Sequence, residues 1–203
     1  MAGDATGDES LLDLGKQYIA EKYSKPGNVY LGVVHRLDRP VSGVALFART
    51  SKSAGRLSSQ FRDGRVQKVY VAWVKGVPPR EADLLTDFLV KDERRNISRT
   101  AAAGTPNAKE SQLEFQVLKT VRGRSLLEVR PHTGRPHQIR VQLSSRGWPI
   151  LGDVKYGGPR CANERAIALH ARSLTFQHPT LKEDIRIEQE SPADWRQWFS
   201  VPG

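Results

Sequence analysis

The chain has 203 residues and a formal net charge of +10, an excess of basic residues that favours an acidic partner such as nucleic acid, although a well-solvated basic surface would give the same charge. Its one cysteine, Cys161, excludes an intramolecular disulfide and a zinc site built on cysteines. No apolar run approaches the roughly 18 residues needed to cross a bilayer, and the polar, acidic N-terminus is unlike a signal peptide, so we expect a cytoplasmic protein.

The N-terminal third is expected to form two helices and two strands. Ser10 can cap a helix from Leu11 to about Tyr23, which Lys25-Pro26-Gly27-Asn28 would stop. Apolar, β-branched stretches at 29–34 and 44–48 predict strands, and residues 52–63 predict a second helix that ends before Gly64.

Strands are expected to dominate the centre of the chain. Alternating apolar patterns predict strands at 66–77, 84–90, 110–121 and 124–129, and Arg122-Gly123 can join the last two as a hairpin. The polar segment 91–109 lacks apolar periodicity and is expected to be an exposed, mobile loop. A helix at 136–146, strands near 171–176 and 185–188, and a final helix near Trp195 complete a mixed α and β domain.

The segment from His35 to Gly43 holds one carboxylate, Asp38, beside His35, Arg36 and Arg39. This segment is a turn between two expected strands. A loop held by rigid elements is the usual address of a catalytic group. The alternative is that Asp38 only caps the turn ahead of Pro40.

A second dense cluster spans residues 122–140, which hold five arginines and one acidic residue, Glu128. Arginine favours planar contacts with phosphate or carboxylate, and the N-terminus of the following helix could help to hold an anion. His132 and His137 are five residues apart, which fits no helical metal-ligand pair. No Gly-x-Ser-x-Gly or Cys-His motif of nucleophilic catalysis is present.

These motifs closely resemble the RluA family of RNA pseudouridine synthases. Five blocks in family order carry the resemblance: His35-Arg36-Leu37-Asp38 with Ser42-Gly43, Lys68 to Gly76, His132 to Arg140, Pro149 to Asp153 with Tyr156-Gly157, and Leu169-His170-Ala171 with His178-Pro179. The resemblance implies an α+β fold around a mixed, mostly antiparallel sheet with flanking helices, and we expect one catalytic domain over residues 1–203.

The resemblance also implies a chemistry and the residues for it. Asp38 matches the catalytic aspartate, which attacks or deprotonates the nucleoside while the bond from ribose C1′ to uracil N1 breaks and C5 then bonds to C1′. Arg140 matches the arginine that pairs with it, with a phosphate contact as the alternative. Tyr70 matches the tyrosine that stacks on the uracil, with an ordinary strand aromatic as the alternative. Arg36 matches a position that can occupy the space left by the flipped nucleotide.

Four further residues receive supporting roles. Arg135 is expected to contact phosphate. His35 is expected to shape the turn before Asp38, and His137 and Gln138 are expected to support the residues that contact the substrate. No cofactor or metal is implied. The expected partner is structured ribosomal or transfer RNA, no membrane partner is expected, and the protein is expected to be a monomer.

The chain also departs from the family pattern. Pro40 and Val41 stand where many relatives have an acidic residue and threonine. We expect the chain to lack the usual first strand and the N-terminal RNA-binding module that several relatives carry. An RNA-binding protein without catalysis is therefore an alternative function, and hydrolysis of a nucleoside is another, which unlike isomerisation would release free base.

Overall fold

The computed structural model describes residues 9–193 and Trp195, which divide into two compact units. The first unit takes residues up to 37 with 45–66 and 176–185, and the second takes 38–44, 67–175 and the residues from 186 onward. The expectation of one catalytic domain over residues 1–203 stays a prediction.

The first unit contains two capped helices and a short ribbon. Helix α1 (Leu11–Lys22) begins after Ser10, whose hydroxyl accepts the Asp13 backbone N–H, and α2 (Ser51–Arg62) begins after Thr50, which caps in the same way. Both helices match the prediction to within one residue. The strands expected at 29–34 and 44–48 shrink to two residues each, β1 (Gly32–Val33) and β3 (Phe47–Ala48), which pair antiparallel.

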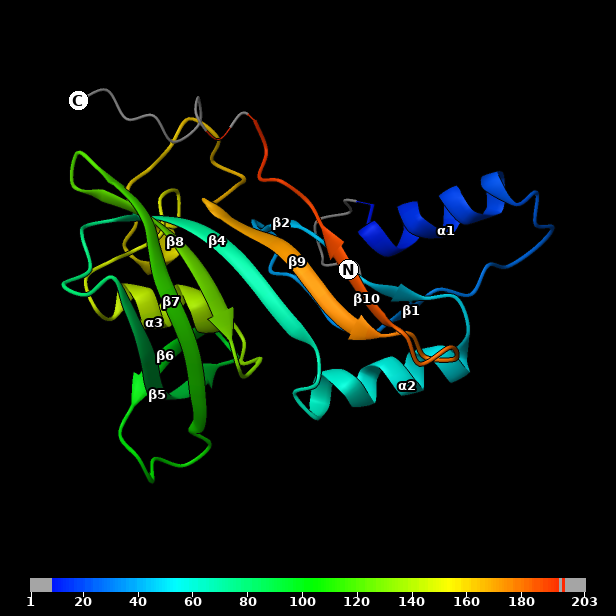
Figure 1. The fold of residues 1–203 in the computed structure, drawn as a ribbon, viewed down its shortest axis with the longest axis horizontal. Coiled ribbons are helices and arrows are strands. Elements are labelled where there is room, and N and C mark those ends of the chain that lie inside the picture. Colours follow the sequence, from blue (N-terminus) through cyan, green and yellow to red (C-terminus); the bar gives the residue numbers. More distant parts are fainter. Residues whose placement is uncertain (1–8, 194, 196–203) are drawn as a thin grey trace. The chain divides into compact units, whose positions relative to one another are not determined.

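The second unit is built on an eight-stranded sheet, which Figure 1 shows with the long strands β4, β7 and β8 beside one another. The strand order is β10-β9-β4-β8-β7-β5-β6, and β2 pairs parallel with β9. The pairs β4–β8, β4–β9, β5–β6, β5–β7 and β7–β8 are antiparallel, so the expected mixed, mostly antiparallel sheet is confirmed. The elements are β2 (Ser42–Gly43), β4 (Gln67–Lys75), β5 (Ala82–Asp92), β6 (Ile97–Ala101), β7 (Lys109–Val121), β8 (Arg124–Pro131), α3 (Gln138–Ser144), a 3-10 turn (Val154–Tyr156), β9 (Leu169–Gln177) and β10 (Asp184–Glu188).

One face of this sheet supplies the main core of the second unit. Side chains that alternate along the strands meet α3 and the segment that follows it, and all of them are buried. Burial of such side chains is the main favourable contribution to folding. The cluster includes Val74, Leu113, Leu127, Val129, Ile139, Leu143, Ile150 and Leu169.

The prediction of a loop at 91–109 was wrong in part, because β6 lies inside this segment and pairs antiparallel with β5. Strand β6 ends the strand order of the sheet, and only Ser98 in it is buried. An edge strand of this kind shows little apolar alternation, which is why its sequence resembled a loop.

The helix expected at 136–146 is also shorter than predicted. Helix α3 begins at Gln138, because His137 adopts a left-handed conformation with φ of 54° and serves as its N-cap. A helix of seven residues is a weak source of the anion-binding end that the sequence suggested. The final helix expected near Trp195 falls mostly outside the described residues. Within the described residues, no helix combines the length and apolar character needed to cross a membrane.

Strand β2 is fixed by an unusually close approach to β9. Gly43 has a φ of 119° and lies beside Ala171, whose carbonyl accepts the Val44 backbone N–H at 2.9 Å. A Cβ atom on Gly43 would lie 2.3 Å from that carbonyl oxygen. Only glycine permits both the backbone conformation and the contact.

We predict that Gly43→Ala lowers the free energy of unfolding by about 3 kcal/mol, because left-handed strain adds to a backbone clash. Urea denaturation measures this change. The control is Gly123→Ala, where φ is 72° but nothing lies within 4 Å of the added carbon; strain alone should cost about 1 kcal/mol there. Equal losses in the two variants would contradict the importance of the contact with Ala171.

Candidate active site

A buried guanidinium lies at the centre of the candidate site. Arg140, on the first turn of α3, donates from Nε and from one terminal nitrogen to the two carboxylate oxygens of Asp153, each at 2.8 Å. Its other terminal nitrogen donates to Oδ2 of Asp38 at 3.0 Å. The sequence-predicted pair of Asp38 and Arg140 is therefore formed, and a second carboxylate holds the arginine from behind.

The exposed fractions order these three side chains from interior to surface. They are 1% for Asp153, 6% for Arg140 and 25% for Asp38. Burial alone would lower the pKa of Arg140, but hydrogen bonds and charge from Asp153, and then from Asp38, raise it. The arginine thus stays charged, and Asp38 is the member of the group that solvent and ligands can reach.

The loop that carries Asp38 is held by its backbone. The Asp38 carbonyl accepts the Val41 N–H at 2.9 Å, and the Pro40 carbonyl accepts the Ile167 N–H at 3.1 Å. The Asp38 carbonyl therefore closes the turn, and its side chain binds Arg140, while the catalytic role expected for Asp38 stays a prediction.

A buried histidine fixes the other end of this loop. His170 Nε2 lies 2.9 Å from the Gln189 carbonyl, which can only accept, so Nε2 carries the proton. Burial lowers the pKa of His170 and keeps the ring neutral, so Nδ1 accepts the Ser42 hydroxyl at 2.9 Å. Ser42 is thereby held opposite His170 in the β2–β9 pair.

His137 joins the site as a neighbour of the aspartate. Its Nε2 lies 3.9 Å from Asp38 Oδ2, and its Nδ1 lies 2.7 Å from the Tyr156 hydroxyl. Burial lowers the pKa of His137 despite the opposing charge of Asp38, so the ring is neutral near pH 7. Its left-handed backbone costs about 1 kcal/mol, which the contacts of the side chain help to offset.

Tyr70 lies on β4, with its side chain partly buried. Burial, and to a smaller degree the charge of Asp38, raises the pKa of Tyr70 to about 12. The tyrosine is therefore neutral and close enough to the aspartate to sense its charge, as a residue that stacks on a base beside Asp38 would be.

Lys68 precedes Tyr70 by two residues on β4, so both side chains are on one face of the strand. Its ammonium group donates to the Thr133 carbonyl at 3.0 Å, and burial lowers the pKa of Lys68 to about 8. The sequence pattern predicted no role for Lys68.

Gln138 and Arg135 organise the turn before α3. Gln138 Oε1 accepts the Thr133 hydroxyl at 2.7 Å and the Arg135 backbone N–H at 3.0 Å, while its amide donates to the Gln112 carbonyl. The Arg135 side chain is half-buried and donates from Nε to the Glu110 carbonyl at 3.0 Å. Gln138 thus supports the backbone of the site, while the phosphate contact expected for Arg135 stays a prediction.

His35 and Arg36 belong to the first unit. His35 Nε2 accepts the Leu46 backbone N–H at 2.8 Å, and its ring stacks on Phe61 with centroids 4.6 Å apart. These contacts agree with a histidine that shapes the chain. Arg36 is exposed, and its expected role in RNA binding stays a prediction.

Sequence reasoning missed the roles of Asp153, Tyr156 and His170. All three lie in blocks that carried the family resemblance, but their types and spacing gave no sign of their partners. The sequence does contain one signal for the ion pair of Asp153. A lone aspartate in the apolar run Pro149 to Val154 needs a cation nearby.

Metal ligation is not supported in the part of the chain that the structure describes, where no group of three or more His, Cys, Asp and Glu side chains could hold an ion. The cation that the carboxylates of the site bind is the guanidinium of Arg140.

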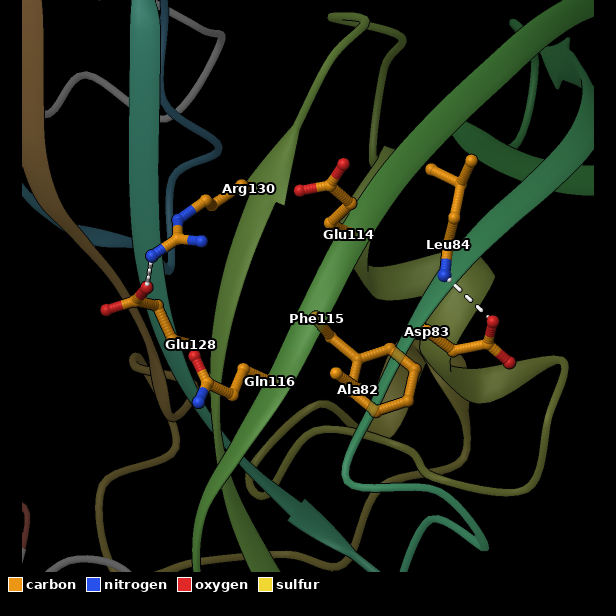
Figure 2. A pocket seen from close by; sticks show the side chains of 8 residues that line it. All are labelled: Ala82, Asp83, Leu84, Glu114, Phe115, Gln116, Glu128 and Arg130. Atoms are coloured by element: carbon orange, nitrogen blue, oxygen red, sulfur yellow. Dashed lines mark hydrogen bonds and ion pairs between the residues drawn. The ribbon is translucent and has the colours of Figure 1, made fainter.

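A separate hollow of about 330 Å³ lies over β5, β7 and β8 (Figure 2). Glu114 and Gln116 alternate with the buried Leu113 and Phe115 and therefore point away from the core. Arg130 and Glu128 pair with each other in it. Its charges are exposed or paired, and no buried cation like Arg140 is among the residues that line it.

The arrangement at Asp38 suits a particular kind of chemistry. A partly exposed carboxylate, fixed by a buried cation on one oxygen, can attack an electron-poor carbon or stabilise positive charge that develops beside it.

Comparisons with known proteins point in one direction. Residues 3–145 match the family model described as RNA pseudouridylate synthase. Over 178 residues the chain is 36% identical to ribosomal large subunit pseudouridine synthase C of Buchnera aphidicola, and over 169 residues 35% identical to the protein of that name from Vibrio cholerae. These matches cover 84% and 80% of this chain but 56% and 52% of the relatives, so the chain spans about half the length of the curated relatives it matches.

Solved structures agree with the sequence comparison. Human RNA pseudouridylate synthase domain containing 1 is 27% identical with a TM-score of 0.71, and the match covers 89% of this chain and 75% of that one. Human RNA pseudouridylate synthase domain containing 4 is 26% identical with a TM-score of 0.72, over 90% and 78% of the two chains.

We predict that Asp153→Asn lowers the free energy of unfolding by about 3 kcal/mol, because it leaves the buried Arg140 without its bidentate partner. Denaturant melts measure the loss. Asp87→Asn is the matched control, since Asp87 pairs with Arg146 at the same 2.8 Å but the two side chains are 18% and 26% exposed; about 1 kcal/mol or less is expected there. A loss for Asp153→Asn no larger than the control would contradict this role.

We predict that Lys68 makes the free energy of unfolding increase with pH between about 8 and 10.5. Its pKa is about 8 when folded against 10.5 for a free lysine, so this contribution is complete above pH 10.5 and is lost as the pH falls toward 8. Between these values the wild type should gain on the order of 1–3 kcal/mol relative to Lys68→Met. Urea melts of both proteins across the window test this, and parallel pH curves would refute it.

Proposed function

The chain belongs to the RNA pseudouridylate synthase family, and from this premise we propose that it isomerises uridine to pseudouridine in RNA. Family membership confirms the resemblance to the RluA family that the sequence motifs indicated. In the proposed reaction the bond from C1′ to N1 breaks, C5 bonds to C1′, the C5 proton leaves to solvent and N1 gains a proton, so the composition of the nucleoside does not change.

One observation carries the proposal: the accessible carboxylate of Asp38 is bound to the buried guanidinium of Arg140. Asp153 already neutralises that guanidinium, so the three groups together hold one negative charge in excess. Asp38 is the exposed end of the group. A negative charge there suits the electron-poor C1′ that forms as the glycosidic bond breaks, for the same reason that carboxylates serve in glycosidases.

Tyr70 is proposed to stack on the target uracil. Its raised pKa keeps the phenol neutral. Tyr70 lies close enough to Asp38 for the charge of that carboxylate to contribute to the raised pKa. The base must leave its stack to reach the aspartate, because C1′ and C5 are not both accessible within a helix. Arg36 is proposed to fill the vacated space, and Arg135 to contact phosphate.

Ribosomal RNA is the proposed substrate, supported by relatives whose names specify the ribosomal large subunit. Transfer RNA is the alternative that the experiment below separates. The net charge of +10 supports an RNA partner with strongly salt-dependent affinity. We propose that the protein acts in the cytoplasm as a monomer, without a metal or cofactor.

Tritium release from RNA labelled at uracil C5 tests the proposal directly. Under single-turnover conditions the wild type should release tritium from unmodified ribosomal RNA, and Asp38→Asn should release it at least about a thousandfold more slowly, because the amide carries no charge to stabilise C1′. Unmodified transfer RNA serves as the second substrate.

Asp83→Asn is the control variant, because Asp83 lies in the hollow over β5, β7 and β8 and its carboxylate accepts from Arg80 and from the Leu84 backbone N–H. It should release tritium at the wild-type rate. RNA binding without release by the wild type would overturn the proposal in favour of an RNA-binding protein, and free uracil in the products would favour hydrolysis.

A further inference from the structure

The hydroxyl of Tyr156 makes two hydrogen bonds, and only one of its two partners can accept the hydroxyl proton. The Ser98 backbone N–H lies 2.8 Å from this oxygen, and His137 Nδ1 lies 2.7 Å from it. The Tyr156 ring is buried and packs with Leu89 and Val141. The hydroxyl therefore links strand β6 to the histidine beside Asp38.

The direction of both hydrogen bonds follows from which of the three atoms carry a proton. A backbone N–H can only donate, so the Tyr156 oxygen accepts from Ser98. Burial raises the pKa of Tyr156 and lowers that of His137, so the hydroxyl keeps its proton and the ring is neutral. If Nδ1 also donated, the hydroxyl proton would be left without an acceptor among the described residues. The hydroxyl must therefore donate to a bare Nδ1.

A neutral imidazole with a bare Nδ1 carries its proton on Nε2. That nitrogen lies 3.9 Å from Oδ2 of Asp38, too far for a direct hydrogen bond but close enough for a favourable charge–dipole contact. The opposite tautomer would turn a lone pair toward the carboxylate. The same oxygen, Oδ2, accepts from Arg140 at 3.0 Å.

We propose that Tyr156 is a positioning residue that holds His137 as the Nε2–H tautomer, so that His137 and Arg140 both face Oδ2 of Asp38 and Oδ1 is the oxygen left to react. This inference rests on the proposed function for its consequence in catalysis, but the tautomer itself is a property of the free protein. Among the described residues the polar contacts of the Asp38 carboxylate fall on Oδ2 alone.

The first test reads the tautomer without RNA. Long-range NMR correlations of isotope-labelled imidazole nitrogens should show His137 with a pyridine-like Nδ1 and a pyrrole-like Nε2. Tyr156→Phe keeps the ring but removes the hydroxyl, and His137 should then populate both tautomers. Tyr18→Phe, on an exposed tyrosine of α1, should leave the His137 signals unchanged. A proton on Nδ1 in the wild type, or an unchanged tautomer in Tyr156→Phe, would overturn the inference.

The second test separates positioning from general support of the fold. Tyr156→Phe should slow single-turnover tritium release about tenfold while RNA affinity stays within about twofold. In a His137→Gln background, where an amide N–H can face Asp38 without help, adding Tyr156→Phe should change the rate less than about twofold. An equal loss in both backgrounds would contradict the proposal.

The two tests fail separately. A wild-type protein that releases no tritium would contradict the proposed function, and the tautomer measured by NMR would still decide the role of Tyr156. Conversely, an active enzyme with a mixed His137 tautomer would keep the proposed function and reject the positioning role.

Discussion

The candidate site depends on a guanidinium that cannot lose its charge and cannot reach water. Burying such a group is costly unless carboxylates compensate it, and Arg140 has two of them, on loops that lie on either side of it in sequence. Asp153 takes two parallel N–H groups and so fixes the plane of the guanidinium. With that plane fixed, the remaining terminal nitrogen can point only toward Asp38. A lysine, with a single nitrogen, could not hold both loops at defined angles.

The electrostatics of the site follow from this geometry. Two neutral histidines lie near the ion pairs: His170 binds Ser42 in the Asp38 loop, and Nε2 of His137 lies near the Asp38 carboxylate. Because neither ring adds positive charge, the excess negative charge stays on Asp38, the most exposed of the charged groups. Preorganised charge of this kind, held by rigid elements, is the form of stabilisation that costs no reorganisation when the reaction occurs.

The sequence predicted the parts of this structure that local physics determines. The long alternating strands were recognised because their patterns reflect burial on one face, and Ser10 because its hydroxyl can accept a backbone N–H at the start of a helix. Arg122-Gly123 was recognised as a hairpin turn because glycine at Gly123 permits the positive φ that this turn needs. Asp38 and Arg140 were found through motif resemblance. Edge strand β6 was missed because only Ser98 in it is buried, so its sequence shows no apolar alternation. The partner of Asp153 was missed because pairing across distant loops leaves no periodic trace.

The attachment of the Asp38 loop to β9 also affects how the site forms during synthesis. Ser42 and His170 are 128 residues apart in sequence, yet their hydrogen bond and the parallel pairing beside it hold the loop in register. Contacts of such long range form late, because a large loop must close first. A nascent chain that has not yet emerged past Ala171 therefore has its aspartate but no fixed place for it. The fixed position of the Asp38 loop therefore depends on His170, which follows Ser42 by 128 residues, so this part of the structure can form only after β9 has been made.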